Sequence, residues 1–360
     1  MRRILVVESS GQLYGSERAL LDVLKSLSNV EVAVCCPPDQ PLNVELEKRE
    51  IRMLDYFIAR THEQSRWRRL AASLGVLRAC LEFRPDLIYL NQSGCFRVVL
   101  PSAIILNVPI VAHVRLYEDA EYLFRAARRS KHLRGVVAIS ESIAEQLRPL
   151  EGAHGPKIRR IYDSYIPYEA TPAGQRELNR IACVARVVPS KGHETLVRAI
   201  GVSEDLKDKI ECYMVGAGEA TFTRQLQDLC FKSNISSRIR WLGFVDPVAP
   251  ILQTCVALVL PTSREGLGRV IFDAWQAGAI PIVFSGSGGA AEVVAASQGG
   301  ILYNEQTPES LATALRSTLL LSDTERGILV DNGRTWLARE CNSAEYGKAI
   351  SELFDYACRR

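Results

Sequence analysis

Several patterns that identify common classes of protein are missing from this chain of 360 residues. Its ten cysteines include no Cys-x-x-Cys pair, and its five histidines are scattered without the spacing of metal ligands. The sequence therefore predicts no structural metal site and no redox motif. Most of the cysteines fall within apolar segments, which is typical of small core side chains in a reducing compartment.

Long uninterrupted hydrophobic runs are also missing. The longest apolar region, residues 98–114, contains Pro101, Asn107 and Pro109, so it is predicted to form a helix and a strand rather than a membrane-spanning helix. The first apolar stretch ends at Glu8, which indicates a strand rather than a signal peptide. We therefore expect a cytoplasmic protein whose contact with a membrane would be peripheral.

What is present is the composition of a folded protein, with 47% hydrophobic and 24% charged residues. The length is sufficient for two α/β domains, each with its own core. The formal net charge is only +3 and no recognition motif for nucleic acid occurs, so nucleic acid is not expected as a partner.

Short apolar segments alternate with helix-length segments along the chain. In the first half, strands are predicted at residues 4–8, 31–35, 51–56, 86–90, 110–113, 135–138 and 158–162, and helices at 42–49, 67–83, 94–106, 119–131 and 141–148. In the second half, strands are predicted at residues 180–185, 211–215, 256–260 and 280–284. Such alternation predicts parallel sheets covered by helices, with ligands bound at the carboxyl ends of the strands.

A linker is predicted at residues 165–174, which contain prolines and lack periodicity. We therefore expect one Rossmann-like domain over residues 1–168 and a second over residues 175–340.

The most informative stretch is residues 261–283, where a strand, a glycine turn, a helix and a second strand follow one another. Glu265 falls at the carboxyl end of the first strand, and Asp273 lies eight positions later. The amides at the start of the predicted helix, residues 269–277, belong to Gly266, Leu267 and Gly268. Unpaired N–H groups and the helix dipole favour a phosphate or a sugar oxygen there. The alternative is that both acids are solvated surface groups.

This stretch resembles the signature of the retaining glycosyltransferases of family 4 (GT4), E-G-F-G-L-P-x-L-E-A-x-A-x-G-x-P-V-V, in which two glutamates are spaced like Glu265 and Asp273. The present chain has E-G-L-G-R-V-I-F-D-A-W-Q-A-G-A-I-P-I-V. It departs from the signature at Leu267, at Arg269 and Val270, and at Asp273, which replaces the second Glu. The resemblance extends over nearly the whole chain and is strongest over residues 180–302.

Further segments of the second half carry the same resemblance. The segment from Arg186 to Lys191 is similar to the family pattern G-R-x-x-x-x-K-G, which implies that the two cations hold the donor diphosphate. Gly216 lies in a segment similar to V-G-x-G, near the nucleotide. The base pocket is implied for a segment that contains Gly243, Phe244 and Val245. From the residues alone, two cations beside a turn and one Gly-x-Gly are weak signals.

In the first half, Gly15 begins a segment similar to the family pattern G-G-x-E-R, which implies a contact with the donor. His113 ends a predicted strand, and the resemblance implies that it faces the transferred sugar. An ordinary tight turn and a structural histidine that makes hydrogen bonds are the alternatives.

Basic residues are concentrated in residues 60–134, which contain thirteen Arg or Lys against six Asp or Glu. They include one group at Arg66, Arg68 and Arg69 beside Trp67, and a second at Arg125, Arg128, Arg129, Lys131 and Arg134. Basic residues with a tryptophan suit anionic lipid headgroups or a pyrophosphate-linked acceptor. A solvated helix face is the alternative.

The resemblance implies an α/β protein of the GT-B architecture, two Rossmann-like domains facing across a cleft, with residues 341–360 crossing back to the first. It implies that Glu265, His113, Arg186 and Lys191 act in catalysis and that Arg269 and Asp273 bind the donor.

The implied reaction is transfer of a hexosyl group from a UDP- or GDP-sugar to a glycan, lipid-pyrophosphate or small-molecule acceptor, in bacterial surface polysaccharide or glycolipid synthesis. The nucleotide sugar is then a substrate, and no metal or other cofactor is expected. A nucleotide-sugar epimerase of similar shape and a noncatalytic binding protein remain as alternatives.

Overall fold

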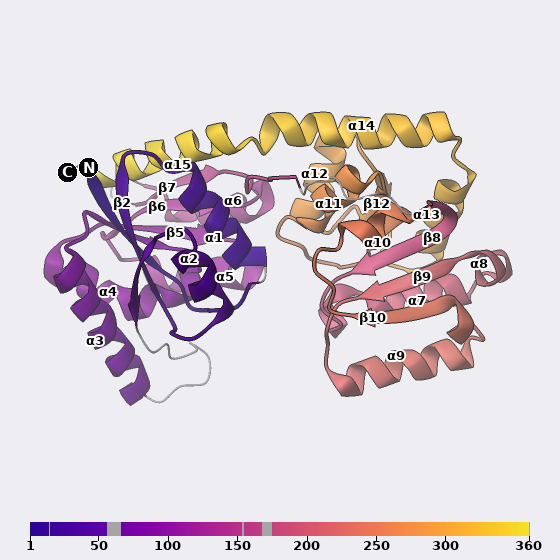
Figure 1. Ribbon diagram of the computed structural model, residues 1–360, viewed down its shortest axis with the longest axis horizontal. Coiled ribbons are helices and arrows are strands. Elements are labelled where there is room, and N and C mark those ends of the chain that lie inside the picture. Colours follow the sequence, from indigo (N-terminus) through magenta and orange to yellow (C-terminus); the bar gives the residue numbers. More distant parts are fainter. Residues whose placement is uncertain (14, 56–65, 153–154, 168–174, 360) are drawn as a thin grey trace. The chain divides into compact units, whose positions relative to one another are not determined.

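The computed structural model describes residues 1–13, 15–55, 66–152, 155–167 and 175–359. The chain divides into two compact units (Figure 1). Unit 1 comprises Met1–Tyr165 together with Cys341–Arg360, and unit 2 comprises Ile166–Glu340. The final helix therefore belongs to the same unit as the first strand. Each unit is described by itself.

The sheet of unit 1 has seven parallel strands in the order β3-β2-β1-β4-β5-β6-β7. At its centre β1 pairs with β2 and β4, so that Val6 is flanked by Val34 and Tyr89. The central strands are apolar runs buried on both faces, as parallel sheets require. The strands are β1 (Arg2–Val7), β2 (Val30–Cys36), β3 (Arg52–Asp55), β4 (Leu87–Leu90), β5 (Ile110–Val114), β6 (Leu133–Ala138) and β7 (Lys157–Arg160).

Two layers of helices cover this sheet. In the first layer, Ile350 and Phe354 of the last helix join Val6 and Tyr89 in one buried apolar cluster. This layer consists of α1 (Gly15–Ser26), α2 (Pro41–Glu47) and α15 (Ser343–Cys358). In the second layer each helix contacts the next: α3 (Arg66–Phe83), α4 (Phe96–Leu106), α5 (Tyr117–Ala127) and α6 (Glu141–Leu147). Right-handed crossovers place the two layers on opposite faces of the sheet.

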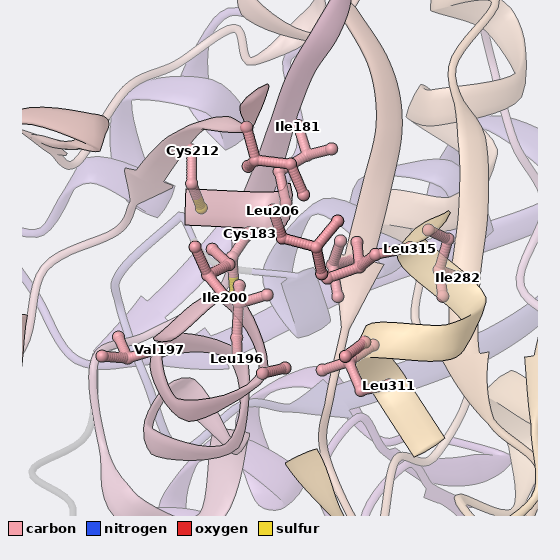
Figure 2. Close-up of a cluster of buried hydrophobic side chains, with 14 of the residues drawn as sticks. Ile181, Cys183, Leu196, Val197, Ile200, Leu206, Cys212, Ile282, Leu311 and Leu315 are labelled. Carbon is pink, nitrogen blue, oxygen red and sulfur yellow. The ribbon is translucent and has the colours of Figure 1, made fainter. Parts of the chain in front are cut away.

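Unit 2 has six parallel strands in the order β10-β9-β8-β11-β12-β13. One face of its sheet packs against α7, α8, α9 and α13 around a core that contains Ile181, Leu196 and Leu311 (Figure 2). A second apolar group stacks Phe272 and Trp275 of α11 with Trp336 of α14. The strands are β8 (Glu177–Val184), β9 (Glu211–Val215), β10 (Ile239–Gly243), β11 (Cys255–Leu260), β12 (Ile280–Phe284) and β13 (Ile301–Tyr303).

The helices of unit 2 are α7 (His193–Gly201), α8 (Glu204–Lys209), α9 (Ala220–Lys232), α10 (Ala249–Gln253), α11 (Val270–Ala277), α12 (Gly289–Ser297), α13 (Pro308–Leu320) and α14 (Asp323–Glu340). Short 3-10 turns occur at η1 (Ser93–Cys95), η2 (Arg148–Leu150), η3 (Pro189–Lys191) and η4 (Ser236–Arg238).

The predicted alternation of strands and helices is confirmed. All eleven predicted strands occur, most of them shifted at an end by one to three residues. Two strands were not predicted, β10 and β13. The predicted end of the third strand, Tyr56, lies outside the described residues. Within the described ranges, no helix has the length and apolar character needed to cross a bilayer.

The cysteines contribute to the cores as small apolar side chains. All ten are free thiols, nine of them are buried, and Cys358 is partly exposed. Burial raises the pKa of Cys183 to about 12 and that of Cys255 to about 11, so these thiols stay protonated at neutral pH. The predicted role as core side chains is confirmed.

Candidate active site

The loops that follow neighbouring strands of unit 2 are joined at the carboxyl edge of its sheet. The amide of Val187 donates to Ala217 O at 2.9 Å, which links the loops after β8 and β9. The amide of Gly216 donates to Gly243 O at 2.7 Å, which links the loops after β9 and β10. Thr262 Oγ1 donates to Ser190 O at 3.1 Å, which links the loops after β8 and β11. Sequence-predicted site residues far apart in the chain therefore lie along one rim.

Two glycines allow these loops to approach each other. At Gly216, where φ is +144°, an added Cβ would lie 2.0 Å from Ala185 O. At Gly192, where φ is +73°, an added Cβ would lie 2.0 Å from Pro261 O. Both positions combine a backbone conformation that favours glycine with a backbone contact that has no space for a side chain. The glycine turn after Lys191 thus fits closely against the segment that leads to Glu265.

Glu265 and Lys191 form an ion pair at this rim. Lys191 Nζ lies 2.6 Å from Glu265 Oε2, and the two side chains are 21% and 16% exposed. The backbone of Glu265 is fixed on both sides, because its amide donates to Ser287 O at 2.7 Å and its carbonyl accepts from the amide of Gly289 at 3.0 Å. Glu265 is therefore held in the loop after β11, beside the start of α12.

The residues after Glu265 form a buried turn into α11. Leu267 is 2% exposed, so its side chain belongs to the core and only its backbone is available to a ligand. The helix begins at Val270, one residue later than predicted, with Arg269 at the N-cap position and no side-chain cap. Within the described residues, no hydrogen bond from the amides of Gly266, Leu267 and Gly268 is found. These donors at a helix start suit an anionic oxygen.

Asp273 lies in the first turn of α11, between the buried side chains of Phe272 and Ala274, and is itself partly buried. A carboxylate in the first turn interacts favourably with the helix dipole, which gives Asp273 a structural reason to be there besides any ligand.

Two other predicted residues of this rim are exposed. Arg186 follows β8, and within the described residues it makes no ion pair. Phe244 is 61% exposed and follows Gly243, where φ is +68° and an added Cβ would meet open space. Val245 is partly buried beside it. An exposed phenyl ring at a ligand-binding edge offers a flat apolar surface, which a nucleobase can stack on.

In unit 1 the predicted residue His113 is fully buried in a polar network at the carboxyl edge of the sheet. Its Nδ1 lies 2.6 Å from the Tyr89 hydroxyl and 2.9 Å from Arg115 Nη2, and its Nε2 lies 3.6 Å from Asp163 Oδ1. These contacts fit the alternative considered above, in which His113 is a structural histidine that makes hydrogen bonds. That it faces the transferred sugar stays a prediction.

The network continues through residues that the sequence analysis did not single out. Arg115 Nη1 donates to Asn91 O at 2.6 Å and to Asn91 Oδ1 at 2.9 Å, and Asn91 Nδ2 donates to Glu8 Oε2. Glu8 and Asn91 are the first polar residues after β1 and β4. A polar residue directly after an apolar strand is the signal that could have identified them.

Two buried carboxyl groups lie in this part of unit 1. Glu8 is fully buried and Glu17 is 1% exposed. Burial and, after it, the neighbouring Glu17 raise the pKa of Glu8 to about 7, although the hydrogen bonds from Asn91 and Ser10 lower it. Gln92 Nε2 donates to Glu17 Oε1 at 3.1 Å. At neutral pH the Glu8 carboxyl is therefore partly protonated.

Gly15 begins α1, and an added Cβ there would meet open space, so packing among the described residues does not require glycine. Within those residues no cluster of three or more His, Cys, Asp or Glu side chains has the arrangement of a metal site.

Comparison with known proteins finds a matching sequence profile for each half of the chain. The sequence profile described as Glycosyltransferase Family 4 matches residues 14–164, and the profile described as Glycosyl transferases group 1 matches residues 179–321. In structure, the chain is similar to the Anabaena protein HepE in complex with UDP-glucose, with a TM-score of 0.79, 19% identity, and coverage of 99% of this chain and 100% of that one.

Two curated relatives are similar in sequence. One is a GDP-mannose-dependent α-(1-6)-phosphatidylinositol monomannoside mannosyltransferase of Mycobacterium tuberculosis, 27% identical over 192 residues, 48% of this chain and 49% of that protein. The other is a lipopolysaccharide core biosynthesis glycosyltransferase of Rhizobium meliloti, LpsE, 26% identical over 173 residues and 48% of each chain. The chain thus matches about half the length of these relatives.

The two parallel Rossmann-like sheets define a protein of the GT-B fold. The chain belongs to the family 4 glycosyltransferases, the glycosyl transferases group 1.

Proposed function

We propose that this protein transfers a hexosyl group from a nucleotide sugar to an acceptor hydroxyl with retention of the anomeric configuration. The observation that carries the proposal is the rim of unit 2, where the Lys191–Glu265 ion pair lies in one set of joined loops with Arg186 and the glycine turn. Two cations, a carboxylate and free amide donors suit a sugar linked to a diphosphate.

Each residue of the rim has a role in this reaction. Arg186, Lys191 and the amides of Gly266, Leu267 and Gly268 bind the diphosphate, and Glu265 binds the sugar hydroxyls or stabilises the positive charge that develops at the anomeric carbon. Arg269 and Asp273 contact the donor, with Asp273 at the ribose. The nucleobase lies near Gly216, Gly243, Phe244 and Val245.

The bond from the anomeric carbon to the phosphate oxygen breaks, and a bond to the acceptor oxygen forms on the same face of the sugar. The departing phosphate oxygen takes the proton of the acceptor hydroxyl, so no covalent nucleophile is required. Fixed cations and amides stabilise the charge that develops on the diphosphate, which removes the need for a divalent metal.

We assign the acceptor to unit 1, with Gly15 and His113 near the donor sugar. A UDP- or GDP-sugar is the proposed donor, supported by the complex of HepE with UDP-glucose and by the GDP-mannose dependence of the mycobacterial relative. A glycan or a lipid-linked acceptor of a surface polysaccharide or glycolipid is proposed because the two sequence relatives act on a phosphatidylinositol mannoside and in lipopolysaccharide core synthesis.

The first test is a thermal-shift screen with UDP-, GDP- and ADP-sugars. A ligand at 100 times its dissociation constant adds about 2.7 kcal/mol to stability, so the donor should raise the melting temperature by several degrees. A matched protein with Arg186→Ala and Lys191→Ala should lose most of this shift. No shift with any nucleotide sugar would contradict the proposal.

Incubation of the donor without acceptor separates the alternatives. An epimerase interconverts the free nucleotide sugars, whereas a transferase consumes the donor at an appreciable rate only when an acceptor is present. A noncatalytic protein would bind the donor and convert it in neither case.

A further inference from the structure

The outer face of α3 exposes a row of large apolar side chains. Trp67 is 79% exposed, Leu70 is 50%, and Leu74 and Leu81 are each 57% exposed. Their spacing of three, four and seven residues places them on one side of the helix. The opposite side is buried in unit 1 and consists of Ala72, Val76, Ala79, Cys80 and Phe83. The helix therefore has two apolar sides, of which unit 1 covers only one.

The neighbouring helix α4 adds to the exposed apolar surface of this layer. Ile104 and Ile105 at its C-terminal end are 55% and 64% exposed. The two helices contact each other along unit 1 (Figure 1). Exposed apolar side chains gathered on adjacent helices, rather than scattered singly, indicate a surface that binds a partner.

The charges on α3 indicate what that partner is. Arg66, Arg68, Arg69 and Arg78 are all exposed, and the first turn contains three of them and no acidic residue. Cations at a helix start are disfavoured by the helix dipole. The helix therefore has an arrangement that its own stability does not favour. Arginines beside exposed Trp and Leu side chains fit an anionic lipid surface, because the headgroups pair with the guanidinium groups and the interface accepts the apolar side chains.

The second basic group of the sequence differs from the α3 group in its position relative to the helix dipole. Arg125 lies in the last turn of α5, and Arg128 and Arg129 follow the end of that helix, where the dipole favours cations. The first turn of α5 has Glu118 and Asp119 instead. The helix dipole favours the charges of α5, so the basic region of the sequence separates into two groups, of which only the α3 group opposes its own helix dipole.

The direction of α3 links this surface to the candidate ligand edge of unit 1. In a parallel α/β unit each connecting helix begins at the carboxyl edge of the sheet. Arg66 and Trp67, at the start of α3, therefore lie toward the edge at which Glu8, Asn91 and His113 form their polar network.

We propose that the outer face of α3, defined by Arg66, Trp67, Leu70, Leu74, Arg78 and Leu81, docks unit 1 on a membrane that contains anionic lipids. The helix lies along the bilayer surface, with Trp67 and the leucines at the level of the headgroups and the arginines on lipid phosphates. This placement brings the candidate acceptor edge to the surface, where an acceptor with a lipid anchor would be presented. That last step rests on the proposed function, whereas the docking itself does not.

The test is binding to vesicles of phosphatidylcholine and phosphatidylglycerol, measured by co-sedimentation and by Trp fluorescence. Trp275 and Trp336 are buried, whereas Trp67 is the most exposed tryptophan, so a blue shift of emission on binding should come from Trp67 and be absent in Trp67→Phe. Arg66→Gln with Arg78→Gln should weaken binding about 30-fold, since each cation near an anionic surface contributes about a factor of five. Leu70→Ser with Leu74→Ser, at exposed positions, should weaken it at least about 10-fold.

Matched controls decide the outcome. The triple variant Arg125→Gln, Arg128→Gln and Arg129→Gln removes more charge from the same unit and should bind almost like the wild type. The proposal is overturned if this control loses binding as much as the α3 variants, if the α3 variants bind normally, or if phosphatidylcholine alone binds equally well. Loss of a dimer in the leucine variant during sedimentation would show instead that the face contacts a second copy. Thermal shifts with nucleotide sugars are measured on the same variants. A variant that loses vesicle binding and keeps its thermal shift has lost docking and not donor binding, so the two proposals can fail separately.

Discussion

Lys191 Nζ lies 2.6 Å from Glu265 Oε2, across two loops whose residues are 74 positions apart in the chain. Both side chains are mostly shielded from water, so the pair should interact more strongly than an exposed ion pair. A bound diphosphate competes with Glu265 for this ammonium group. The two residues should therefore behave in mutagenesis as one electrostatic unit.

Glu265→Gln keeps the shape of the side chain and removes its charge. Because the carboxylate is proposed to act at the developing positive charge, we expect turnover to fall by roughly 10² or more. Nucleotide binding should be kept, because the glutamine side chain no longer competes as an anion with the diphosphate for the Lys191 ammonium group. Steady-state kinetics and calorimetry check the two parts separately, and turnover near that of the wild type would rule out a central role for Glu265.

Lys191→Ala and Arg186→Ala should each weaken nucleoside diphosphate binding by about 2 kcal/mol, the size of a charge-assisted hydrogen bond. Lys191→Ala also leaves the Glu265 carboxylate without its ion-pair partner, close to the diphosphate. The double variant Lys191→Ala with Glu265→Gln should therefore bind the diphosphate more tightly than Lys191→Ala alone. A nucleoside without phosphates is the control ligand. If its affinity falls as much as that of the nucleoside diphosphate, the assignment of Lys191 and Arg186 to the diphosphate is wrong.

Asp273→Ala should raise the Michaelis constant of the donor more than it lowers turnover, because a ribose contact contributes equally to the ground state and the transition state. The Asp273 side chain is one methylene shorter than the usual Glu, so its carboxylate contacts the ribose either at close range or through a water molecule. Donor affinity that does not change would show that Asp273 does not bind the donor.

Activity should survive EDTA. Arg186, Lys191 and the amides before α11 are proposed to neutralise the leaving diphosphate, which enzymes with an Asp-x-Asp motif achieve with a divalent metal. No two aspartates of this chain have that spacing. If chelation abolishes turnover in a protein that stays folded, and Mg²⁺ or Mn²⁺ restores it, the assignment of the two cations is wrong.

The buried Glu8 carboxyl should make stability depend on pH. Its pKa is about 7 in the folded protein, against about 4.3 for an unperturbed glutamate, so between these values the folded state holds a proton that the unfolded state has lost. Stability should therefore decrease as pH rises through this window, by about 4 kcal/mol in total, and stay level above it.

Glu8→Gln has no carboxyl to ionise at this position and should lose most of that pH dependence. Melting temperatures of the two proteins between pH 5 and pH 8 provide the measurement. Parallel curves would show that the charge of Glu8 is not what destabilises the fold at higher pH.

The sequence alone determined the alternation of strands and helices and the family signature around Glu265. Short apolar runs bounded by turns, such as β11, favour buried strands, and glycine turns such as the one after Lys191 reflect local backbone geometry, so both are local properties. The strands that were missed show the limit of this approach. β13 has only three residues, and β10 has an exposed Leu242 and the left-handed Gly243, so neither presents a continuous apolar run.

Only the tertiary structure decided which polar residues meet. The Lys191–Glu265 pair, and the network from Glu8 through Asn91 and Arg115 toward His113, join loops after strands that are neighbours in the sheet but distant in the chain. Strand order is set by crossover packing, which no local periodicity encodes. Packing also decided which side of α3 is buried, because both sides are apolar in the sequence and only the sheet beneath the helix distinguishes them.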